Sequence, residues 1–234
     1  MKAERAPSPP LVIAHRGAHG GYARRENKLP AFARALDMRV DAVECDVHLS
    51  ADNEPVVIHD ETLGRTTTGS GTVNVRTAGE LRQLGVPTLR ELCRLVRGRA
   101  RLLVEIKTAS PDRVLDVILA EEMEKSVLVF SFHAEYLRPI ASLRPDIELA
   151  FLLGRFDRHV PDVRAAIQLC HSLNATAFAP NATLCSCQLI AAVHAAGLRV
   201  FTWTVDTPPR MRAMIARHVD GIITNYPDRL KALL

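Results

Sequence analysis

The segment Leu102–Leu153, LLVEIKTASPDRVLDVILAEEMEKSVLVFSFHAEYLRPIASLRPDIELAFLL, alternates short apolar runs with longer amphipathic ones. The short runs, Leu102–Ile106, Val127–Phe132 and Ile147–Leu153, lack a polar face, which is typical of strands buried on both sides of a parallel sheet. Between them, Pro111–Met123 and Ala134–Leu143 have helical spacing. The order strand, helix, strand, helix, strand predicts a parallel sheet with helical crossovers.

The same alternation extends in both directions along the chain. Five further strands are expected at Leu11–Ala14, Ala42–Leu49, Ala175–Ala179, Val200–Val205 and Gly221–Thr224. Six further helices are expected at Leu29–Met38, Thr88–Val96, Val160–Leu173, Thr183–Ala196, Pro208–His218 and Asp228–Leu234. Eight strands alternating with eight helices in 234 residues predict an α/β fold, the (β/α)8 TIM barrel, rather than two small domains.

One interval between strands is longer than the others. Most successive strands begin 20 to 31 residues apart, but the second and third begin at 42 and 101, a step of 59. The excess lies at about 60–87, where glycine and threonine are frequent, and it predicts loops and turns above the barrel mouth after a short strand at Val56–Ile58. Residues 1–234 are therefore expected to form one barrel domain with an insertion after strand 2.

Composition excludes several classes of protein. Apolar residues make up 47% and charged residues 24%, which excludes a disordered or collagen-like chain. The net charge is +4 with 5% aromatic residues, and the arginines are scattered, so binding to nucleic acid is not expected. No apolar run approaches the roughly 18 residues of a membrane span and no signal peptide is visible, so we expect a soluble cytoplasmic protein.

Cysteine usage also favours the cytoplasm. The cysteines are odd in number, widely spaced and lack a CxxC pair, so reduced, buried thiols are expected. The five are Cys45, Cys93, Cys170, Cys185 and Cys187. The oligomeric state stays open.

Polar residues gather at the predicted carboxyl ends of the strands, where barrels of this class place their active sites. Three carboxylates, two histidines and two cations are expected to meet there, beside two aromatic residues. They are Glu44, Asp46, Glu105, His15, His59, Arg16, Lys107, Phe132 and Trp203.

The three carboxylates favour a metal site. Glu44 and Asp46 are two residues apart, so their side chains share one face of a strand, and Glu105 on the next strand would supply a third ligand. Oxygen ligands of this kind suit one divalent cation, Mg²⁺ or Ca²⁺, better than zinc. The alternative is a buried ion network in which Glu44 and Asp46 pair with Arg16 and Lys107.

The two histidines and two cations suit cleavage of a phosphate ester. His15 and His59 come from different strands, and imidazoles on opposite sides of a phosphate fit general acid and general base roles. Arg16 and Lys107 would stabilise the negative charge that develops on the phosphate oxygens.

These residues belong to an ordered set of motifs that resembles the glycerophosphodiester phosphodiesterases from Ile13 to Leu230. The motifs are His15-Arg16-Gly17, Glu26-Asn27, Glu44-Cys45-Asp46-Val47, Val57-Ile58-His59-Asp60, Leu63-Gly64-Arg65-Thr66-Thr67, Glu105-Ile106-Lys107, Ser131-Phe132, Trp203-Thr204-Val205 and Asp220-Gly221-Ile222-Ile223-Thr224-Asn225. The resemblance implies a (β/α)8 barrel with a segment inserted after its second strand. It also implies metal-dependent hydrolysis of glycerophosphodiesters to sn-glycerol 3-phosphate and an alcohol.

The resemblance also implies roles for individual residues. It makes His15 and His59 the catalytic acid and base, without saying which is which, and it assigns the metal to Glu44, Asp46 and Glu105. It assigns contact with the phosphate to Arg16 and Lys107. It assigns the lining of the glycerol or leaving-group pocket to Phe132 and Trp203, although Trp203 could equally be a packing residue of the barrel. Glu26 and Asn27 would shape the site, where this chain has Arg25-Glu26-Asn27-Lys28 in place of the family's Pro-Glu-Asn-Thr.

Two other functions remain as alternatives. A lysophospholipase D-type phosphodiesterase would need an exposed apolar rim for an acyl chain, and the sequence shows none. A non-catalytic barrel that binds phosphate esters would not need all seven of the carboxylates, histidines and cations named above. The expected partner is a small-molecule glycerophosphodiester.

Overall fold

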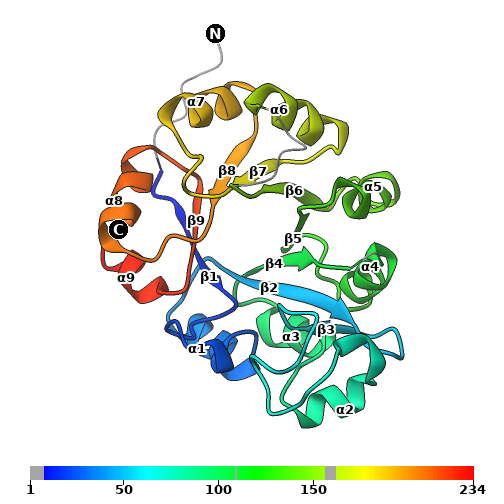
Figure 1. Cartoon of the computed structure of the whole chain (residues 1–234). Coiled ribbons are helices and arrows are strands. Elements are labelled where there is room, and N and C mark those ends of the chain that lie inside the picture. The colour runs from blue at the N-terminus through cyan, green and yellow to red at the C-terminus, as the bar shows by residue number, and fades with distance from the viewer. Residues whose placement is uncertain (1–7, 109, 156–161) are drawn as a thin grey trace.

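The structure is a computed structural model that describes residues 8–108, 110–155 and 162–234. Eight parallel strands form its centre: β1 (Leu11–His15), β2 (Ala42–Leu49), β4 (Arg101–Ile106), β5 (Val127–Ser131), β6 (Glu148–Leu153), β7 (Ala177–Pro180), β8 (Arg199–Thr202) and β9 (Gly221–Thr224). β1 pairs with both β2 and β9, which closes the sheet into a barrel. The predicted (β/α)8 barrel is confirmed (Figure 1).

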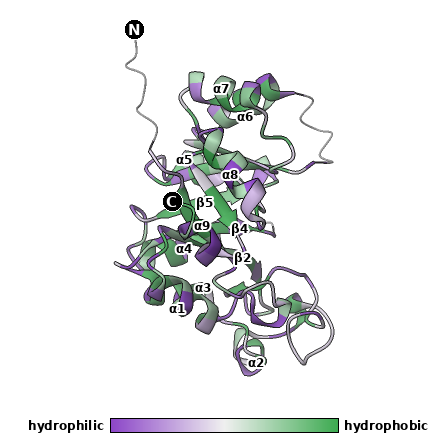
Figure 2. Cartoon of the chain, turned by 90° about the vertical axis from the view of Figure 1, so that its left-hand side faces the viewer, coloured by the Kyte–Doolittle hydropathy of each residue, from purple (hydrophilic) through white to green (hydrophobic). Residues whose placement is uncertain are grey.

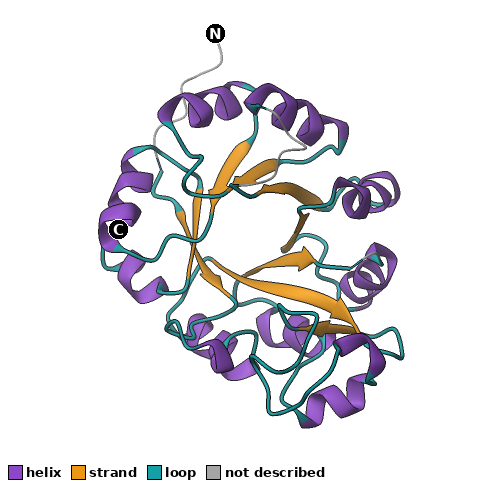
Figure 3. Cartoon of the chain, in the orientation of Figure 1, coloured by secondary structure: helices purple, strands orange, loops and turns teal. Residues whose placement is uncertain are grey.

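Helices surround the barrel (Figure 3). They are α1 (Leu29–Asp37), α3 (Leu89–Val96), α4 (Pro111–Ala120), α5 (Ala134–Leu143), α6 (Val163–Ser172), α7 (Cys187–Ala195), α8 (Pro208–Ala216) and α9 (Pro227–Lys231). Proline occupies at least one of the first two positions of α1, α4, α8 and α9, where its missing N–H costs nothing. No helix in the described ranges is long and apolar enough to cross a membrane.

The strands separate two apolar cores. On β2, Val43, Cys45 and Val47 point outward into the core beneath the helices, while Ala42 points into the barrel interior with Ile13 and other apolar residues. Glu44 and Asp46 follow Ala42 at intervals of two and therefore face the interior. Cys45 packs behind them, as predicted. Figure 2 shows the hydrophobic strands enclosed by helices of mixed polarity.

The predicted insertion has more structure than expected. The short strand β3 (Pro55–Val57) pairs antiparallel with β2, and the 3₁₀ turn η2 (Val73–Val75) and helix α2 (Ala78–Gln83) follow it. The prediction of loops and turns alone was wrong for α2. A capping box between Thr77 and Glu80 begins this helix, and that pair was the available sequence signal.

Other differences concern the ends of elements. α7 begins at Cys187 rather than Thr183, because the Ser186 side chain caps it by accepting a hydrogen bond from the Leu189 N–H. Cys187 is therefore exposed on the first helical turn, against the prediction that all five thiols are buried, while the other four are buried and free. The predicted start of α6 at Val160 lies outside the described residues. Phe132 and Trp203 each lie one residue beyond their strand.

Candidate active site

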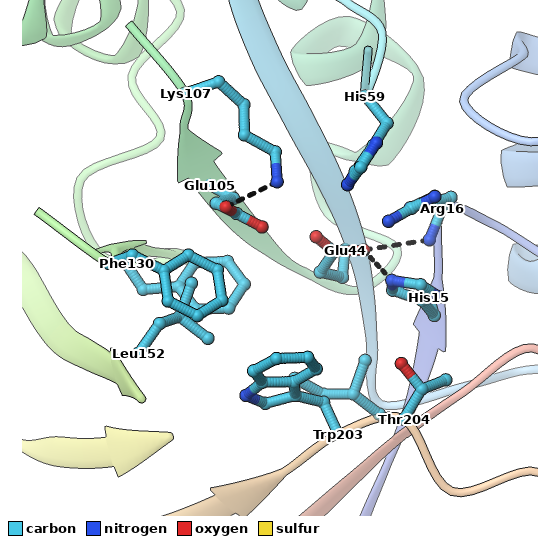
Figure 4. Close-up of a pocket in the computed structure, with 12 residues that line it drawn as sticks. His15, Arg16, Glu44, His59, Glu105, Lys107, Phe130, Leu152, Trp203 and Thr204 are labelled. Carbon is cyan, nitrogen blue, oxygen red and sulfur yellow. Dashed lines mark hydrogen bonds and ion pairs between the residues drawn. The ribbon is translucent and has the colours of Figure 1, made fainter. Parts of the chain in front are cut away.

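A pocket of about 110 Å³ opens at the carboxyl ends of the strands (Figure 4). Eight of the predicted site residues line it: His15, Arg16, Glu44, His59, Glu105, Lys107, Phe132 and Trp203. Phe130, Leu152, Thr204 and Ile223 complete the wall. The remaining predicted residues, Asp46, Glu26 and Asn27, are buried, and each contacts Arg16 in the lining.

Three buried carboxylates meet at this pocket. Asp46 on β2 is in register with Glu105 on β4, and Glu44 lies two residues earlier on the same face of β2. One oxygen from each of the three lies within 4.8 Å of the others. Such a set of closely spaced anionic oxygens is the donor set that a hard divalent cation prefers, so these residues could hold Mg²⁺ or Ca²⁺.

Two cations neutralise part of this charge. Arg16 Nε lies 3.0 Å from Asp46 Oδ2, and Lys107 Nζ lies 2.6 Å from Glu105 Oε1 and 3.2 Å from Asp46 Oδ1. Burial disfavours ionisation of Asp46, yet Lys107 and Arg16 hold the pKa of its carboxyl well below the usual range. The alternative ion network therefore exists for Asp46, and Lys107 extends it to Glu105 rather than to Glu44.

Glu44 takes no part in this network of ion pairs. Its Oε2 accepts a hydrogen bond from the backbone N–H of Arg16 at 3.0 Å, and no Lys or Arg side chain in the described ranges forms an ion pair with it. Burial and the neighbouring Asp46 charge raise the pKa of Glu44 well above its ordinary value. A carboxylate that burial keeps from ionising is stabilised by a bound cation, so the residues present fit a metal.

The connection after β1 brings Arg16 to the carboxylates. Arg16 and Asn27 both have positive φ angles, of 53° and 54°, and Asn27 donates its side-chain N–H to Asp46 Oδ2 at 2.8 Å. Glu26 Oε1 accepts from Arg16 Nη1 at 2.9 Å. A Cβ at Gly17 would lie 2.8 Å from the backbone carbon of Ala31, so only glycine permits this turn. The site-shaping positions predicted from the sequence thus touch the predicted metal and phosphate residues.

His15 is held in one tautomer by a chain of polar groups. Its Nδ1 lies 2.7 Å from Asn225 Oδ1, and Asn225 in turn donates its side-chain N–H to Asp206 Oδ2 at 2.7 Å. Because the carboxylate can only accept, the amide oxygen faces His15 and Nδ1 carries the proton. The other nitrogen, Nε2, lies 3.9 Å from Glu44 Oε2 and has a free lone pair. Burial, reinforced by Arg16, lowers the pKa of His15 to about 4, so the ring is neutral at pH 7.

His59 approaches from the insertion. Its Nδ1 lies 2.6 Å from Asp60 Oδ1, and its side chain is 33% exposed, compared with 14% for His15. Arg65 donates to both oxygens of Asp60, at 2.6 and 2.9 Å, and to Glu26 Oε1 at 2.6 Å. This arginine ties the loop of His59 to the loop of Arg16.

Sequence reasoning gave no role to four supporting residues, Asp60, Arg65, Asp206 and Asn225, although all but Asp206 stand in the motifs quoted above. Asp60 and Arg65 lie beside His59 in the chain, so their proximity to it was readable from the sequence. Asn225 is 210 residues from His15, and no local pattern signals that contact.

The opposite wall of the pocket is aromatic. The rings of Phe132 and Trp203 meet edge to face with centroids 5.4 Å apart, and Lys107 Nζ lies 5.9 Å from the Phe132 centroid. Trp203 donates its indole N–H to the Ala179 carbonyl at 2.9 Å, which fixes the ring. In Figure 4 Trp203 lies across the pocket from Lys107 and His59, so the pocket suits a ligand with one anionic and one less polar end.

The buried carboxylates predict how stability depends on pH when no metal is bound. Burial, which outweighs Lys107, raises the pKa of Glu105 from 4.5 to about 7. The folded chain then binds a proton that the unfolded chain loses near pH 4.5, so this stabilisation is complete below that pH and is lost as pH rises through about 7. The lowered pKa of His15 makes the folded chain more stable as pH rises, which opposes the effect of Glu105. The effect of Glu105 is therefore isolated by comparing the stability of the unsubstituted chain with that of a Glu105 variant.

We expect Glu105→Gln to gain thermal stability relative to the unsubstituted chain as the pH rises from 4.5 to 7, both in EDTA. With saturating Mg²⁺ or Ca²⁺ the difference should reverse, because the amide is a poorer ligand. A difference in melting temperature that stays constant across this range in EDTA would show that Glu105 ionises normally.

Known proteins resemble this chain over nearly its whole length. The family model described as the glycerophosphoryl diester phosphodiesterase family matches residues 15–229. A glycerophosphodiester phosphodiesterase of Caldanaerobacter subterraneus subsp. tengcongensis is 32% identical over 240 residues, which cover 94% of this chain and 96% of that protein.

Solved structures agree with this similarity. The crystal structure of a glycerophosphodiester phosphodiesterase from Agrobacterium tumefaciens superposes with a TM-score of 0.81 at 27% identity, over 95% of this chain and 99% of that one. A phosphodiesterase of Oleispira antarctica, solved in complex with the product sn-glycerol-3-phosphate, shares the fold with a TM-score of 0.84 at 23% identity, over 96% of both chains.

Proposed function

Since the chain belongs to the glycerophosphoryl diester phosphodiesterase family and is a phosphoric diester hydrolase, we propose that it uses one divalent cation and two histidines to release sn-glycerol 3-phosphate and an alcohol from glycerophosphodiesters. The observation that carries this proposal is the cluster of three buried carboxylates within 4.8 Å, flanked in one pocket by His15 and His59.

Glu44, Asp46 and Glu105 would hold the cation, Mg²⁺ or Ca²⁺. When bound, it would supply positive charge to a phosphate oxygen and so stabilise the transition state. Arg16 and Lys107 line the same pocket and would bind the other phosphate oxygens. Each stays charged at neutral pH, because the carboxylates outweigh the effect of burial and raise the pKa of both side chains.

The different partners of the two Nδ1 atoms, an amide oxygen for His15 and a carboxylate for His59, support a division of roles between the histidines. His15 is neutral and offers the Nε2 lone pair to the pocket, so it would accept the proton of the nucleophile, which is water or the neighbouring glycerol hydroxyl. Burial lowers the pKa of His59 below its ordinary value, but Asp46 and the Asp60 carboxylate, 2.6 Å from Nδ1, oppose that shift and would stabilise the charged form when a proton is taken up. His59 would donate a proton from Nε2 to the departing alkoxide.

Phe132 and Trp203 would bind the less polar end of the substrate. Their rings meet edge to face, Trp203 lies across the pocket from Lys107 and His59 (Figure 4), and burial of carbon-bound hydrogens against aromatic rings is favourable. With the anion held at Lys107 and Arg16, these rings would orient the ester bond between the two histidines.

We also propose a cellular location for the protein, the cytoplasm. The four buried cysteines are free thiols, which supports a reducing compartment, the cytoplasm. We also propose that residues 1–234 act as one domain.

A panel of substrates separates this proposal from its alternatives. The metal-loaded protein is incubated with glycerophosphocholine, glycerophosphoethanolamine and lysophosphatidylcholine, and the freed choline or ethanolamine is measured. We expect release from the first two alone. Release of choline from lysophosphatidylcholine alone would instead favour a lysophospholipase D, and turnover of none of the three would favour a binding barrel.

A further inference from the structure

A second and larger cavity, of about 310 Å³, adjoins helix α1. The 3₁₀ turn η1 (Ala23–Arg25) and the first two turns of α1 contribute its lining. Four of its seven lining residues carry positive charge, and the lining contains no acidic residue; the four are Arg24, Arg25, Lys28 and Arg34. In the described part of the chain it shares no lining residue with the catalytic pocket.

These four cations have no counter-charge of their own. Within the described residues, none of them forms an ion pair or a side-chain hydrogen bond, and Arg25 only stacks on the Tyr22 ring at 4.7 Å. Glu26 is the one carboxylate of the described chain that opposes the lowering of the Lys28 pKa by burial, and it does not reverse that lowering. Its Oε1 already accepts hydrogen bonds from Arg16 and Arg65.

Elsewhere the chain neutralises its arginine clusters. Arg90, Arg94 and Arg97 lie on or beside α3 and converge on the buried Glu121, at 3.0, 3.0 and 2.7 Å. Arg101 and Arg199 likewise share Glu148. The group around α1 is therefore not simply a consequence of arginine-rich composition, because a comparable cluster nearby in the fold has its own carboxylate.

Lys28 is the cation for which the absence of a negatively charged partner, among the residues that the structure describes, matters most. Its side chain is half-buried against the cavity, and burial lowers its pKa despite the influence of Glu26. An ammonium group that loses water without gaining a partner is destabilised, and an anion in the cavity would restore the lost interaction.

The chemistry of the lining indicates the class of anion. Three guanidinium groups offer planar pairs of N–H donors, which match the oxygens of a phosphate group, and Lys28 adds a point charge. Several positive charges around one cavity strengthen the attraction for such an anion.

We propose that the cavity between η1 and α1 is a second anion site that binds a phosphate group, separate from the catalytic pocket. The phosphate is either free, as in a phosphomonoester, or part of an anionic lipid headgroup. The site does not depend on the proposed catalytic function, because none of its four cations lines the catalytic pocket.

Binding of inorganic phosphate to the full chain in EDTA, measured by calorimetry at low ionic strength, tests the proposal. The variants Lys28→Gln/Arg34→Gln and Arg24→Gln/Arg25→Gln each remove two charges from the cavity. The matched control, Arg210→Gln/Arg212→Gln, removes two exposed charges near the start of α8. We expect each cavity variant to weaken binding about tenfold, while the control changes it less than about twofold. All three should retain the thermal midpoint and the hydrolytic activity.

A second arm identifies the source of the phosphate. The same proteins are sedimented with vesicles of phosphatidylglycerol or of phosphatidylcholine. Selective loss of vesicle binding to phosphatidylglycerol in both cavity variants supports the proposal with a lipid headgroup as ligand, and selective loss of inorganic phosphate binding supports it with a free phosphate. If the cavity variants match the control in both arms, there is no second anion site.

Discussion

Replacing His15 by alanine is expected to lower kcat by a factor of about 10² to 10⁴, the usual contribution of a general base. The residue is neutral because burial lowers its pKa to about 4, and its Nε2 lone pair faces the carboxylate cluster. KM should change little, because Arg16 and Lys107 remain to bind the phosphate. Steady-state kinetics with glycerophosphocholine at saturating metal give both constants.

His19 supplies a matched control for this substitution. Its Nε2 lies 2.8 Å from the same Asn225 oxygen that accepts from His15, but His19 does not line the catalytic pocket. His19→Ala should therefore lower kcat by less than about 100-fold. If His15→Ala instead kept kcat within that same range, His15 would have no part in proton transfer.

The leaving group separates the two histidines. A general acid matters less when the alcohol leaves easily, so the defect of His59→Ala should shrink with a nitrophenyl ester of glycerol phosphate. The defect of His15→Ala should persist, because the nucleophile must still lose its proton. The opposite pattern would exchange the two roles.

Glu44→Gln is expected to have two opposite effects. Metal affinity should fall by about 100-fold or more, since loss of even a supporting group costs 10- to 100-fold. The metal-free protein should nevertheless melt at a higher temperature, because the substitution removes a buried carboxyl that crowds Asp46 and Glu105 within 4.8 Å and has no side-chain ion pair with Lys or Arg in the described ranges. Calorimetric titration with Mg²⁺ and Ca²⁺ measures the first effect, and thermal unfolding in EDTA measures the second.

Glu121→Gln provides the contrasting control. This carboxylate is also buried, at 4% exposure, but three arginines bind it. Its substitution should lower the melting temperature and leave metal affinity unchanged. If Glu44→Gln resembled Glu121→Gln in both measurements, Glu44 would be part of a structural ion network and not a metal ligand.

The features that were predictable from the sequence depend on short-range geometry. Apolar runs without a polar face identified the strands. The two-residue repeat along β2 predicted that Glu44 and Asp46 lie on one face of the strand and Cys45 on the other. The carboxyl-end rule then brought residues from several strands to one pocket, because parallel strands end at the same edge.

The features that were not predictable depend on distant contacts or on weak local signals. Asp206 and Asn225 fix the tautomer of His15 through contacts that only closure of the barrel creates. Helix α2 is only six residues long, too short for a periodic pattern, so only its capping box could have indicated it. Cys187 is exposed because Ser186, and not Thr183, caps α7.

Release of sn-glycerol 3-phosphate from glycerophosphocholine, measured with Mg²⁺ or Ca²⁺ and again after EDTA, tests the proposed metal-dependent hydrolysis most directly. We expect steady release with at least one of these cations, its loss in EDTA, and its return when that cation is restored in excess. Release that continues undiminished in EDTA would contradict the assignment of the metal to Glu44, Asp46 and Glu105, and absence of release with either cation would contradict the proposed reaction itself.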